Sequence, residues 1–556
     1  MSAPTAPPSA RFFTHAVENQ VPALPPFNAY LADRALLEAV HREGGGWGEE
    51  RLIAFGQLSG GELLELGFAA NVHKPTLRLF DRGGQRLDEV EFHPAYHRIM
   101  ELAIAHGVPS LAWTDPRPGA HVVRAALAFL HAQAEQGTGC PLTMTYACVP
   151  TLRHQVEVAA DWLPRLWSTS YDPRSLPVTQ KRGATLGMGM TEKQGGSDVR
   201  SNTTRAFPLE QPGPGQAYEL VGHKWFLSAP MCDAFLVLAQ ADEGLSCFLL
   251  PRWRPDGSRN ALRIQRLKEK LGNWSNASSE VEFHGAYALL IGTPGRGVAT
   301  ILEMVALTRL DCMMGSAATM RQALVQALHH AEHRRVFGKR LIEQPLMRQV
   351  LADLALESEA ATALTLRIAR AVDEAPRDPQ AAALARLGTA IGKYWICKRT
   401  PVMVNEAQEC LGGAGYVEES ILPRLYREAP LNSIWEGCGN IQCLDVLRAL
   451  TRAPATADAY FAELEAARGR HHLLDRAADD LRSRLRDLST LEAPSRWLVE
   501  RLALALQAAI LLRAGNQTIA DSFCATRLSG EHGLCFGAWP AALPTTGILD
   551  RAWHDG

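Results

Sequence analysis

The order of periodic segments along the chain constrains the fold more than any other feature of the sequence. From Tyr30 to about Leu176 the pattern is mostly helical, with apolar residues three and four positions apart. Between residues 183 and 296 the chain changes to short, alternating, β-rich segments separated by Gly, Pro, Asn and Asp, and the helical period then returns. Separate blocks of helices and strands do not build alternating βαβ units. The sequence therefore predicts a mainly α-helical protein with a central β-barrel of about 110 residues.

Composition breaks divide the chain into five expected parts. At 556 residues the chain has room for several domains. Ala453-Pro454-Ala455-Thr456 is predicted to be a linker into a last helical segment. The expected parts are an N-terminal arm (1–34), an N-terminal helical domain (35–182), a β-barrel domain (183–296), a C-terminal helical domain (297–450) and an additional helical domain (451–556).

Charge, cysteine usage and missing motifs exclude several classes of function. The formal net charge is −2, so overall charge gives no argument for a polyanionic partner. None of the 11 cysteines form a C-x-x-C pair, which favours reduced thiols in a cytoplasmic protein. The N-terminus lacks a secretory signal, and the apolar run from Leu502 to Leu512 is too short to span a bilayer. No phosphate-binding loop or G-x-G-x-x-G turn is present, so a Rossmann turn holds no cofactor here.

The segment IWEGCGNIQ places a lone carboxylate, Glu436, between an aromatic residue and a glycine. An apolar neighbour such as Trp435 raises the pKa of a carboxyl group and makes it a better base. Gly437 allows the backbone to approach another group closely. The alternative interpretation is a loop glutamate that caps a helix.

Two β-rich segments carry groups suited to a planar or phosphorylated ligand. The loop of MTEKQGGSD offers the Thr191 and Ser197 hydroxyls together with exposed backbone N–H groups, although it could be a plain glycine-rich turn. In GHKWFLS the strand period predicts Phe226 and Ser228 on one face and Trp225 on the other. Phe226 and Ser228 could bind a flat ring, or they could belong to the barrel core.

Two further elements lie in the returning helical region. Arg334, in RRVFG at an expected helix end, suits a pyrophosphate, or it neutralises the helix C-terminus. The segment LGGAGY, residues 411–416, predicts a glycine-dense helix break where another backbone or an adenosine could approach.

Taken in this order, the elements resemble the acyl-CoA dehydrogenase family of flavoproteins. The resemblance rests on the Thr-Glu-…-Gly-Ser-Asp loop, the aromatic-x-Ser strand end, Arg-x-x-Phe-Gly, Gly-Gly-x-Gly-Tyr and the aromatic-Glu-Gly segment, and it spans roughly residues 35–450. Within this family the chain is most similar to the adaptive-response branch. The similarity rests on the additional C-terminal segment and on MTEKQGGSDV, VGHKWF, RLYRE, NSIWEGCGNI and CLDVLR. That branch is described as FAD-binding, DNA-binding and linked to defence against DNA alkylation.

The resemblance implies FAD as cofactor and a four-helix bundle within residues 297–450. Thr191 and Ser228 would hydrogen-bond the isoalloxazine, Phe226 would line its face, and Ser197 would lie near the pyrophosphate. Arg334 would reach an FAD held mainly by a neighbouring subunit of a homotetramer. The other cofactor-binding candidates are Met190, Leu227, Trp435, Gly437, Cys438 and Asn440.

The same resemblance implies that Glu436 is the catalytic base for an acyl-CoA thioester, with Arg309 close to it. Trp435 replaces the tyrosine usual in the family, and Ala306 stands where several relatives carry an aspartate that contacts CoA. Two functions remain open. One is binding of double-stranded DNA, with protection or repair under alkylation stress. The other is metabolic dehydrogenation of a short or branched acyl-CoA.

DNA binding would depend on arginines near the C-terminus. Residues 451–556 carry 12 Arg and 13 Asp plus Glu, so the segment is not basic overall. Arg482 and Arg486 are predicted one helical turn apart, and Arg448 is a further candidate. The alternative is a solvated helix face. Without a recognition-helix signature, any DNA binding is expected to be independent of sequence. His329 and His333 have chelating spacing but no further ligand set, so no metal site is predicted.

Overall fold

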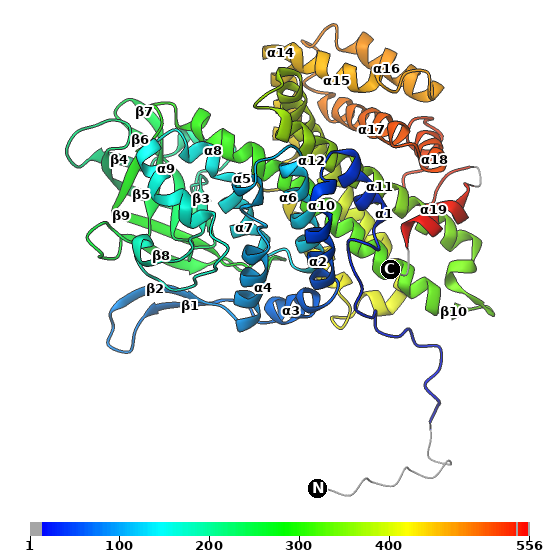
Figure 1. Ribbon diagram of the computed structural model, residues 1–556, viewed down its shortest axis with the longest axis horizontal. Helices are drawn as coiled ribbons and strands as arrows, with labels where there is room; N and C mark the ends of the chain where they lie inside the picture. The colour runs from blue at the N-terminus through cyan, green and yellow to red at the C-terminus, as the bar shows by residue number, and fades with distance from the viewer. Residues whose placement is uncertain (1–13, 541–542, 554–556) are drawn as a thin grey trace, which may run out of the picture.

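The computed structural model describes residues 14–540 and 543–553, and Figure 1 shows their arrangement. The mainly α-helical fold with a central β-barrel is confirmed. The first thirteen residues of the predicted arm and the last three residues of the chain lie outside the described residues. From residue 14 to Asp33 the arm contains no helix or strand.

Helices dominate the region before the barrel. Its longest helix, α6, is buried along nearly its whole length, because its apolar residues face several neighbouring helices at once. The helices are α1 (Arg34–Arg42), α2 (Glu49–Ser59), α3 (Glu62–Val72), α4 (Pro94–Ala105), α5 (Leu111–Thr114), α6 (Ala120–Ala134), α7 (Gly139–Ala147), α8 (Val149–Leu152) and α9 (Val156–Leu166).

An antiparallel hairpin interrupts these helices, and the sequence analysis missed it. Strands β1 (Thr76–Phe80) and β2 (Arg86–Glu91) pair around a turn that the Asp81 carboxylate closes through two backbone N–H groups. Asp88 accepts a hydrogen bond from Ile264 N at 2.9 Å, so the hairpin reaches the barrel. The region is mostly helical, as expected, but this hairpin was not predicted. The alternation in TLRLF was the available signal.

The central barrel is a closed ring of five strands, β6, β4, β5, β9 and β7, because β6 pairs with β7 as well as with β4. β3 is added beside β6, and β8 beside β9. Closure removes exposed strand edges and fixes where the ends of β3 and β5 lie. The strands are β3 (Leu186–Gly189), β4 (Arg205–Pro208), β5 (Ala217–Ser228), β6 (Ala234–Ala241), β7 (Gly244–Pro251), β8 (Leu262–Leu267) and β9 (Ser278–Ile291).

A register shift near the end of β5 corrects one expectation. Pairing with β9 is irregular between Lys224 and Leu227, and both of these residues are buried although they are three positions apart. The Lys268 amino group lies 3.4 Å from the Trp225 ring centroid and 4.6 Å from that of Phe226. Trp225 and Phe226 therefore share one side of the strand. The prediction of opposite faces was wrong, because a bulge breaks the two-residue period.

Long helices form the region after the barrel. Helix α10 packs against α12, α11 and α6, and the Arg124 guanidinium of α6 forms a buried ion pair with Asp311 of α10. The helix break predicted at residues 411–416 is present, because α12 ends at Leu411. The elements are α10 (Gly297–His333), β10 (Arg335–Val336), β11 (Lys339–Arg340), α11 (Pro345–Glu374), α12 (Pro379–Leu411), α13 (Leu422–Glu428) and α14 (Gly439–Arg452).

The C-terminal helices pack on this bundle and not apart from it. Helix α17 contacts α11 and α12, and buried Arg527 pairs with Asp353 and Glu357 of α11. The predicted linker is shorter than expected, since Ala455 and Thr456 already belong to α15. The helices are α15 (Ala455–Glu465), α16 (His472–Arg484), α17 (Ser495–Ala514), α18 (Gln517–Arg527) and α19 (Thr545–Ala552).

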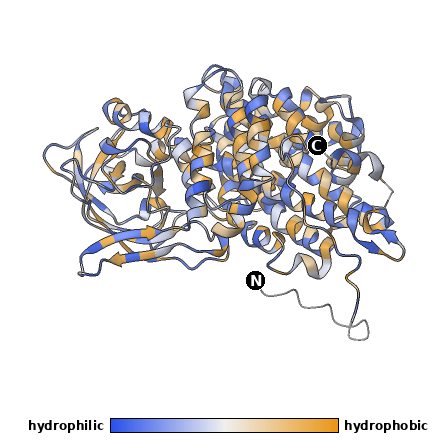
Figure 2. Cartoon of the chain, turned by 60° about the horizontal axis from the view of Figure 1, so that its bottom comes forward, coloured by the Kyte–Doolittle hydropathy of each residue, from blue (hydrophilic) through white to orange (hydrophobic). Residues whose placement is uncertain are grey.

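Figure 2 shows hydrophobic and hydrophilic residues interleaved along the long helices, as expected for helices that bury one side. Among the described residues, no helix combines the length and the apolar character needed to cross a bilayer.

Candidate active site

A strained turn before α14 holds Glu436. Glu436 has φ +58° and Gly437 has φ +92°, so two consecutive residues adopt the left-handed conformation. This conformation is uncommon for a residue with a Cβ and persists only where the surroundings enforce it. Such strain is concentrated at functional sites.

Three side chains enforce the turn through its carbonyl groups. The buried Lys393 of α12 donates from Nζ to the carbonyls of Asn432, Trp435 and Gly437, at 3.1, 2.9 and 2.7 Å. Arg309 Nε donates to the Glu436 carbonyl at 2.9 Å. Gln442 Nε2 donates to the Glu436 and Gly437 carbonyls, at 3.2 and 2.9 Å. Backbone carbonyls that turn away from helical hydrogen bonding are thus satisfied.

The Glu436 carboxylate has one intramolecular hydrogen bond within the described chain, from Thr308 Oγ1 of α10 at 2.7 Å. Burial raises the pKa of Glu436, and the Thr308 hydrogen bond and the Lys393 and Arg309 charges only partly offset this. A carboxylate with a raised pKa is a stronger proton acceptor than an exposed one. The turn therefore presents a base.

Other contacts keep the base free of strong ion pairs. Arg309 Nη1 lies 2.9 Å from Asp445 Oδ2, so its guanidinium is engaged by Asp445 and by the Glu436 carbonyl, and not by the Glu436 carboxylate. Trp435 Nε1 donates to Asn432 Oδ1 at 2.8 Å, which fixes the indole beside the base. The structure thus brings the predicted residues Arg309, Trp435, Glu436 and Gly437 together.

The end of β5 lies near this turn. Ser228 Oγ is 3.1 Å from Ser278 Oγ at the start of β9. Burial raises the pKa of the Cys140 thiol of α7 to about 11, with a hydrogen bond to Ser228 opposing and the Glu436 charge contributing to the rise. The Cys140 thiol therefore lies close enough to Ser228 at the barrel end and to Glu436 for both residues to affect its pKa. Lys270 Nζ lies 3.3 Å from Ser278 Oγ, and burial lowers the pKa of Lys270 to about 8.

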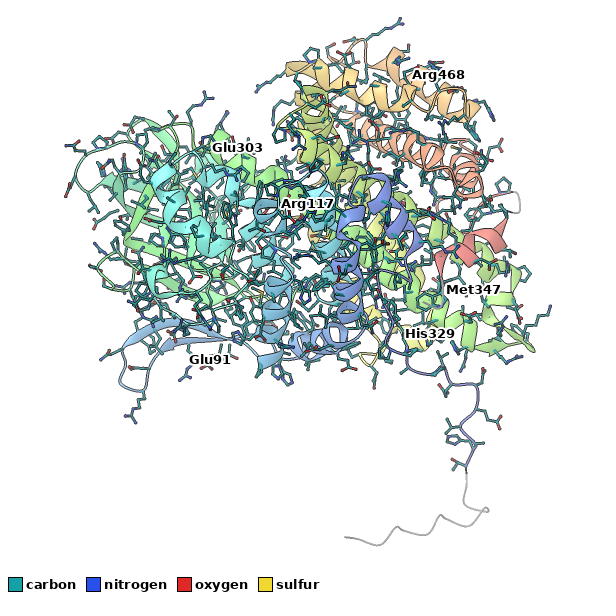
Figure 3. The ribbon with its side chains drawn as sticks, in the orientation of Figure 1. Glu91, Arg117, Glu303, His329, Met347 and Arg468 are labelled. Atoms are coloured by element: carbon teal, nitrogen blue, oxygen red, sulfur yellow. The ribbon has the colours of Figure 1, made fainter. Side chains whose placement is uncertain are left out.

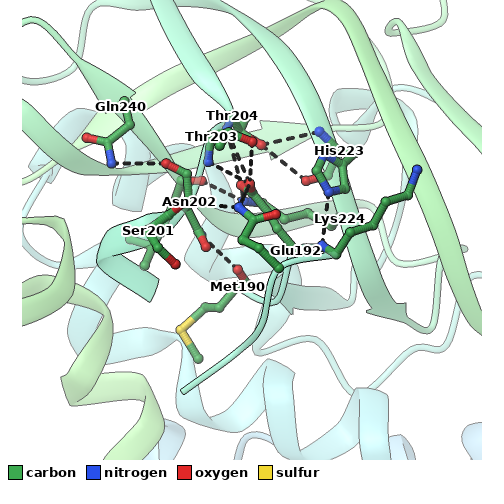
Figure 4. A network of polar contacts seen from close by, with 12 residues as sticks. Met190, Glu192, Ser201, Asn202, Thr203, Thr204, His223, Lys224 and Gln240 are labelled. Carbon is green, nitrogen blue, oxygen red and sulfur yellow. Dashed lines mark hydrogen bonds and ion pairs between the residues drawn. The ribbon is translucent and has the colours of Figure 1, made fainter. Parts of the chain in front are cut away.

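The loop after β3 is anchored by a buried ion pair (Figure 4). Glu192 Oε1 lies 2.7 Å from Lys224 Nζ, and Glu192 Oε2 accepts from Thr203 N at 2.7 Å. Burial alone would raise the pKa of Glu192, but Lys224 and the hydrogen bonds from Thr203 and Thr204 together outweigh burial, and the pKa falls to about 2. A Cβ on Gly196 would lie 2.5 Å from Thr191 Oγ1, so the loop closes tightly over Thr191. Met190 and Thr191 are held in place, while Ser197 is exposed.

These residues fit a flat cofactor with a phosphate tail. Phe226 leaves 49% of its surface exposed at the barrel end, and Thr191 Oγ1 has no hydrogen-bond partner within the described part of the chain. At the start of α14 no side chain caps the helix, Cys438 and Asn440 are exposed, and free N–H groups there favour an anion. Leu227 is buried below this surface.

Arg334, a predicted cofactor residue, lies far from the Glu436 turn in the single chain. It follows α10, and the 25 residues between Arg309 and Arg334 correspond to about 37 Å of helix. Its Nη1 donates to the Asn19 carbonyl at 2.5 Å.

The arginines predicted for DNA form a different arrangement from the one expected. Helix α16 ends at Arg484, so Arg486 lies beyond it and the predicted one-turn helical spacing is wrong. Arg482 Nη2 lies 2.8 Å from Glu465 Oε1. Arg448 lies 3.5 Å from Asp445 Oδ1 and is half exposed.

Sequence reasoning missed Thr308, Lys393, Cys140 and Lys270, because nothing in their local pattern marks them. A lysine inside an apolar helical stretch was the one signal for Lys393. Within the described residues no group of three potential metal ligands is present, and His333 Nδ1 hydrogen-bonds the His329 carbonyl.

The fold and the base at the turn define a protein of the acyl-CoA dehydrogenase class. Family models match three stretches: the N-terminal domain of adaptive response protein AidB (residues 19–173), the acyl-CoA dehydrogenase middle domain (187–286) and its C-terminal domain (295–451). AidB of Escherichia coli (strain K12) is 50% identical over 94% of this chain and 96% of its own length. The chain therefore belongs to the acyl-CoA dehydrogenase family, with an AidB-type N-terminal domain.

Solved structures agree with this assignment. ACDH-11 of Caenorhabditis elegans, in complex with C11-CoA, superposes with a TM-score of 0.82 at 27% identity and covers 93% of this chain and 94% of its own. A Bacillus anthracis acyl-CoA dehydrogenase complexed with FAD has a TM-score of 0.63 at 17% identity and covers 78% and 80%, which supports the fold. Members of this family are FAD-dependent.

Proposed function

We propose that the chain is an FAD-dependent oxidoreductase that removes a proton from the α-carbon of an acyl-CoA thioester. The observation that carries this proposal is the Glu436 carboxylate, held in a left-handed turn with a raised pKa and one hydrogen bond from Thr308. The C. elegans relative in complex with C11-CoA supports a thioester as substrate.

The residues of this chain have separate tasks in the proposal. Thr191 and Ser228 offer hydroxyls to the edge of the flavin, and Phe226 offers its exposed face. Ser197, Cys438 and the start of α14 suit the phosphates. FAD supplies the hydride acceptor when it is bound.

Glu436 takes the α-proton while the β-carbon loses a hydride, so that a Cα=Cβ double bond forms. Lys393 and Arg309 hold the turn through its carbonyls, which keeps the carboxylate positioned without neutralising it directly. Thr308 donates to the carboxylate and tunes its basicity.

The test is anaerobic mixing of the FAD-loaded protein with saturated C4 to C12 and branched acyl-CoAs. Loss of flavin absorbance with at least one of them supports dehydrogenation. Glu436→Gln is expected to keep FAD and lose the bleaching, because the amide cannot accept the proton. Bleaching at an undiminished rate in that variant would remove Glu436 from the role of base.

A homotetramer belongs to the same proposal. Arg334 is remote from the Glu436 turn of its own chain, and Phe337, three residues after it, is 97% exposed with φ +51°. An exposed aromatic residue beside an arginine suits contact with a cofactor of a neighbouring subunit. Sedimentation should give a tetramer, and Arg334→Ala should lower the FAD content of the purified protein.

A second candidate is sequence-independent binding of double-stranded DNA. The observation that favours it is a set of exposed arginines on and after α14 and α16: Arg448, Arg452, Arg476 and Arg486. Within the described residues Arg452, Arg476 and Arg486 have no ion-pair partner. The opposing observation is that Arg468, Arg482 and Arg484 are paired with carboxylates (Figure 3 labels Arg468).

A salt-titrated gel shift with duplex DNA tests this candidate. Binding at low salt should weaken steeply as salt rises, because counterions are released from the phosphates. The double variants Arg482→Ala/Arg486→Ala and Arg448→Ala/Arg476→Ala should each reduce both the affinity and the salt slope. Arg205→Ala/Arg263→Ala, two exposed arginines of the barrel, is the matched control. Equal binding by all variants would refute a role for this face.

A further inference from the structure

A cavity of about 430 Å³ lies on the hairpin side of the barrel. Its walls come from β2, from α4, from the loop 171–175, and from the segments that follow β5 and β7. No residue of the turn before α14 lines it. Pro141 and Ala229 line the cavity, and their chain neighbours Cys140 and Ser228 belong to the candidate active site, so the two sites adjoin but have different lining residues. Figure 3 labels Glu91, on the β2 side of this cavity.

Arg252 gives the cavity a positive charge without an ion-pair partner among the described residues. Its guanidinium has a single long contact, from Nη2 to the Asp88 carbonyl at 3.5 Å, and no carboxylate within 4.0 Å among the described residues. Burial lowers the pKa of Arg252, and the nearest opposing charge is that of Asp233. The Arg252 side chain is half-buried, and a guanidinium that loses part of its water without gaining a carboxylate favours an anionic ligand.

The other ionic groups of the wall are already paired. Glu89 pairs with Arg259 at 2.5 Å, and Glu91 pairs with Arg78 at 2.6 Å. Asp172 pairs with Arg174 at 2.7 Å, and Lys181 pairs with Asp233 at 2.5 Å. The cavity lining therefore carries three cations and three carboxylates, and Arg252 is the one of these six groups without an ion-pair partner among the described residues.

The rest of the wall combines apolar surface with one hydroxyl, that of Ser175, which has no hydrogen-bond partner among the described residues. Ser175 Oγ is buried, although Ser175 lines the cavity. His97 Nδ1 and Tyr171 Oη bond each other at 2.9 Å, so both groups are already paired, and both side chains line the cavity. The apolar lining residues are Val90, Phe92, Met100, Pro141 and Met231.

We propose that this cavity binds a monoanionic carboxylate with a compact apolar body, the carboxylate paired with the Arg252 guanidinium. A planar carboxylate matches the guanidinium in a bidentate pair. Ser175 Oγ is a second donor, and the aromatic and methionine side chains receive the apolar body. One unpaired guanidinium suits one negative charge, whereas Glu89, Glu91 and Asp172 on the wall repel a dianion such as phosphate. The volume is in the range of small-molecule sites.

The test is isothermal titration of the FAD-loaded protein with hexanoate and phenylacetate, with hexanamide and inorganic phosphate as comparison ligands. The carboxylates should bind with a dissociation constant below about 1 mM, and hexanamide at least tenfold more weakly. Arg252→Met should weaken carboxylate binding at least tenfold. Arg263→Met, the same substitution at an exposed position of β8, should leave it unchanged. Met231→Trp reduces the volume without altering charge and should also weaken binding, which covers a failure of Arg252→Met to fold.

Several results would overturn the proposal. One is the absence of any binding heat at carboxylate concentrations up to about 10 mM. Another is equal carboxylate affinity in the wild type and in Arg252→Met. A third is phosphate binding as tight as carboxylate binding. Binding lost in Glu436→Gln would assign the probe to the turn before α14 and would also overturn it. A negative result here leaves acyl-CoA oxidation untouched, since the two tests use different variants and different ligands.

Discussion

Replacing Thr308 by valine should move the pH profile of flavin reduction to higher pH. In the wild type the single hydroxyl proton of Thr308 has two acceptors within reach, Glu436 Oε2 at 2.7 Å and the Val305 carbonyl at 3.0 Å. When Glu436 is ionised the proton goes to the carboxylate, the stronger acceptor. When Glu436 is protonated the hydroxyl turns to Val305. Thr308 therefore stabilises the ionised form selectively.

The magnitude follows from that selectivity. A hydrogen bond to a charged group contributes about 1.5–3 kcal/mol, and one pKa unit corresponds to about 1.4 kcal/mol. When Glu436 is neutral, Thr308 still donates to the Val305 carbonyl, so only part of this free energy favours the ionised form. Removing the Thr308 hydroxyl should therefore raise the pKa of Glu436 by about one unit further. Since burial already raises this pKa, activity of the wild type should increase with pH at values above the ordinary carboxyl range of glutamate.

The assay is the single-turnover rate of flavin reduction by the best acyl-CoA, measured across pH. Thr308→Val should shift the acid limb upward by about one pH unit and lower the rate about tenfold at pH values below both limbs. Above both limbs the two rates should converge. Thr308→Ser restores the donor and should restore the profile. An unchanged limb in Thr308→Val, with substrate saturation confirmed, would refute the reasoning.

Three further predictions concern the same site and its supports. Lys393→Met removes the donor to three carbonyls. It should lower the free energy of unfolding by about 3 kcal/mol and the rate of flavin reduction more than tenfold. Lys74→Met, at an exposed position, is the control. Glu436→Gln should raise Tm at pH 7 but not at pH 4. Because the folded-state pKa of Glu436 is raised, the folded protein is more stable with neutral Glu436 and loses this stability as pH rises, whereas Gln stays neutral. An equal Tm difference at both pH values would contradict this reasoning. Glu192→Gln leaves Lys224 without its carboxylate and should cost about 3–5 kcal/mol, seen as a lower Tm and faster proteolysis of the loop 190–202. In the wild type this contribution is present above the ordinary glutamate pKa and is lost as pH falls towards 2, because the folded pKa of Glu192 is lowered to about 2.

Local patterns predicted some elements well and others poorly. The barrel was recognisable because its strands alternate and are separated by turn residues. The β1–β2 hairpin was missed, since its second strand carries three acidic residues and lies between strongly helical segments. The bulge in β5 was also missed, because the extra residue is set by pairing with β9 and leaves no trace in the segment itself.

The C-terminal arginines show the same limit. Their spacing in the sequence predicted a common helix face, but α16 ends at Arg484, and Arg482 is paired with Glu465 of another helix. Whether an arginine is free to meet a phosphate depends on which carboxylates the fold brings to it. That choice is made by tertiary packing.

The sequence by itself determined the succession of helical, strand and helical blocks, the family, and the presence of an acid between an aromatic residue and a glycine. These features are local, so short-range periodicity and residue order express them fully. Only the tertiary structure decided that Thr308, 128 residues away, donates to that acid and that Lys393 clamps the turn around it. It also decided that Arg252 faces a cavity without a counter-charge. The strength of a base and the charge of a cavity depend on burial and on partners distant in the chain, and these exist only once the chain has folded.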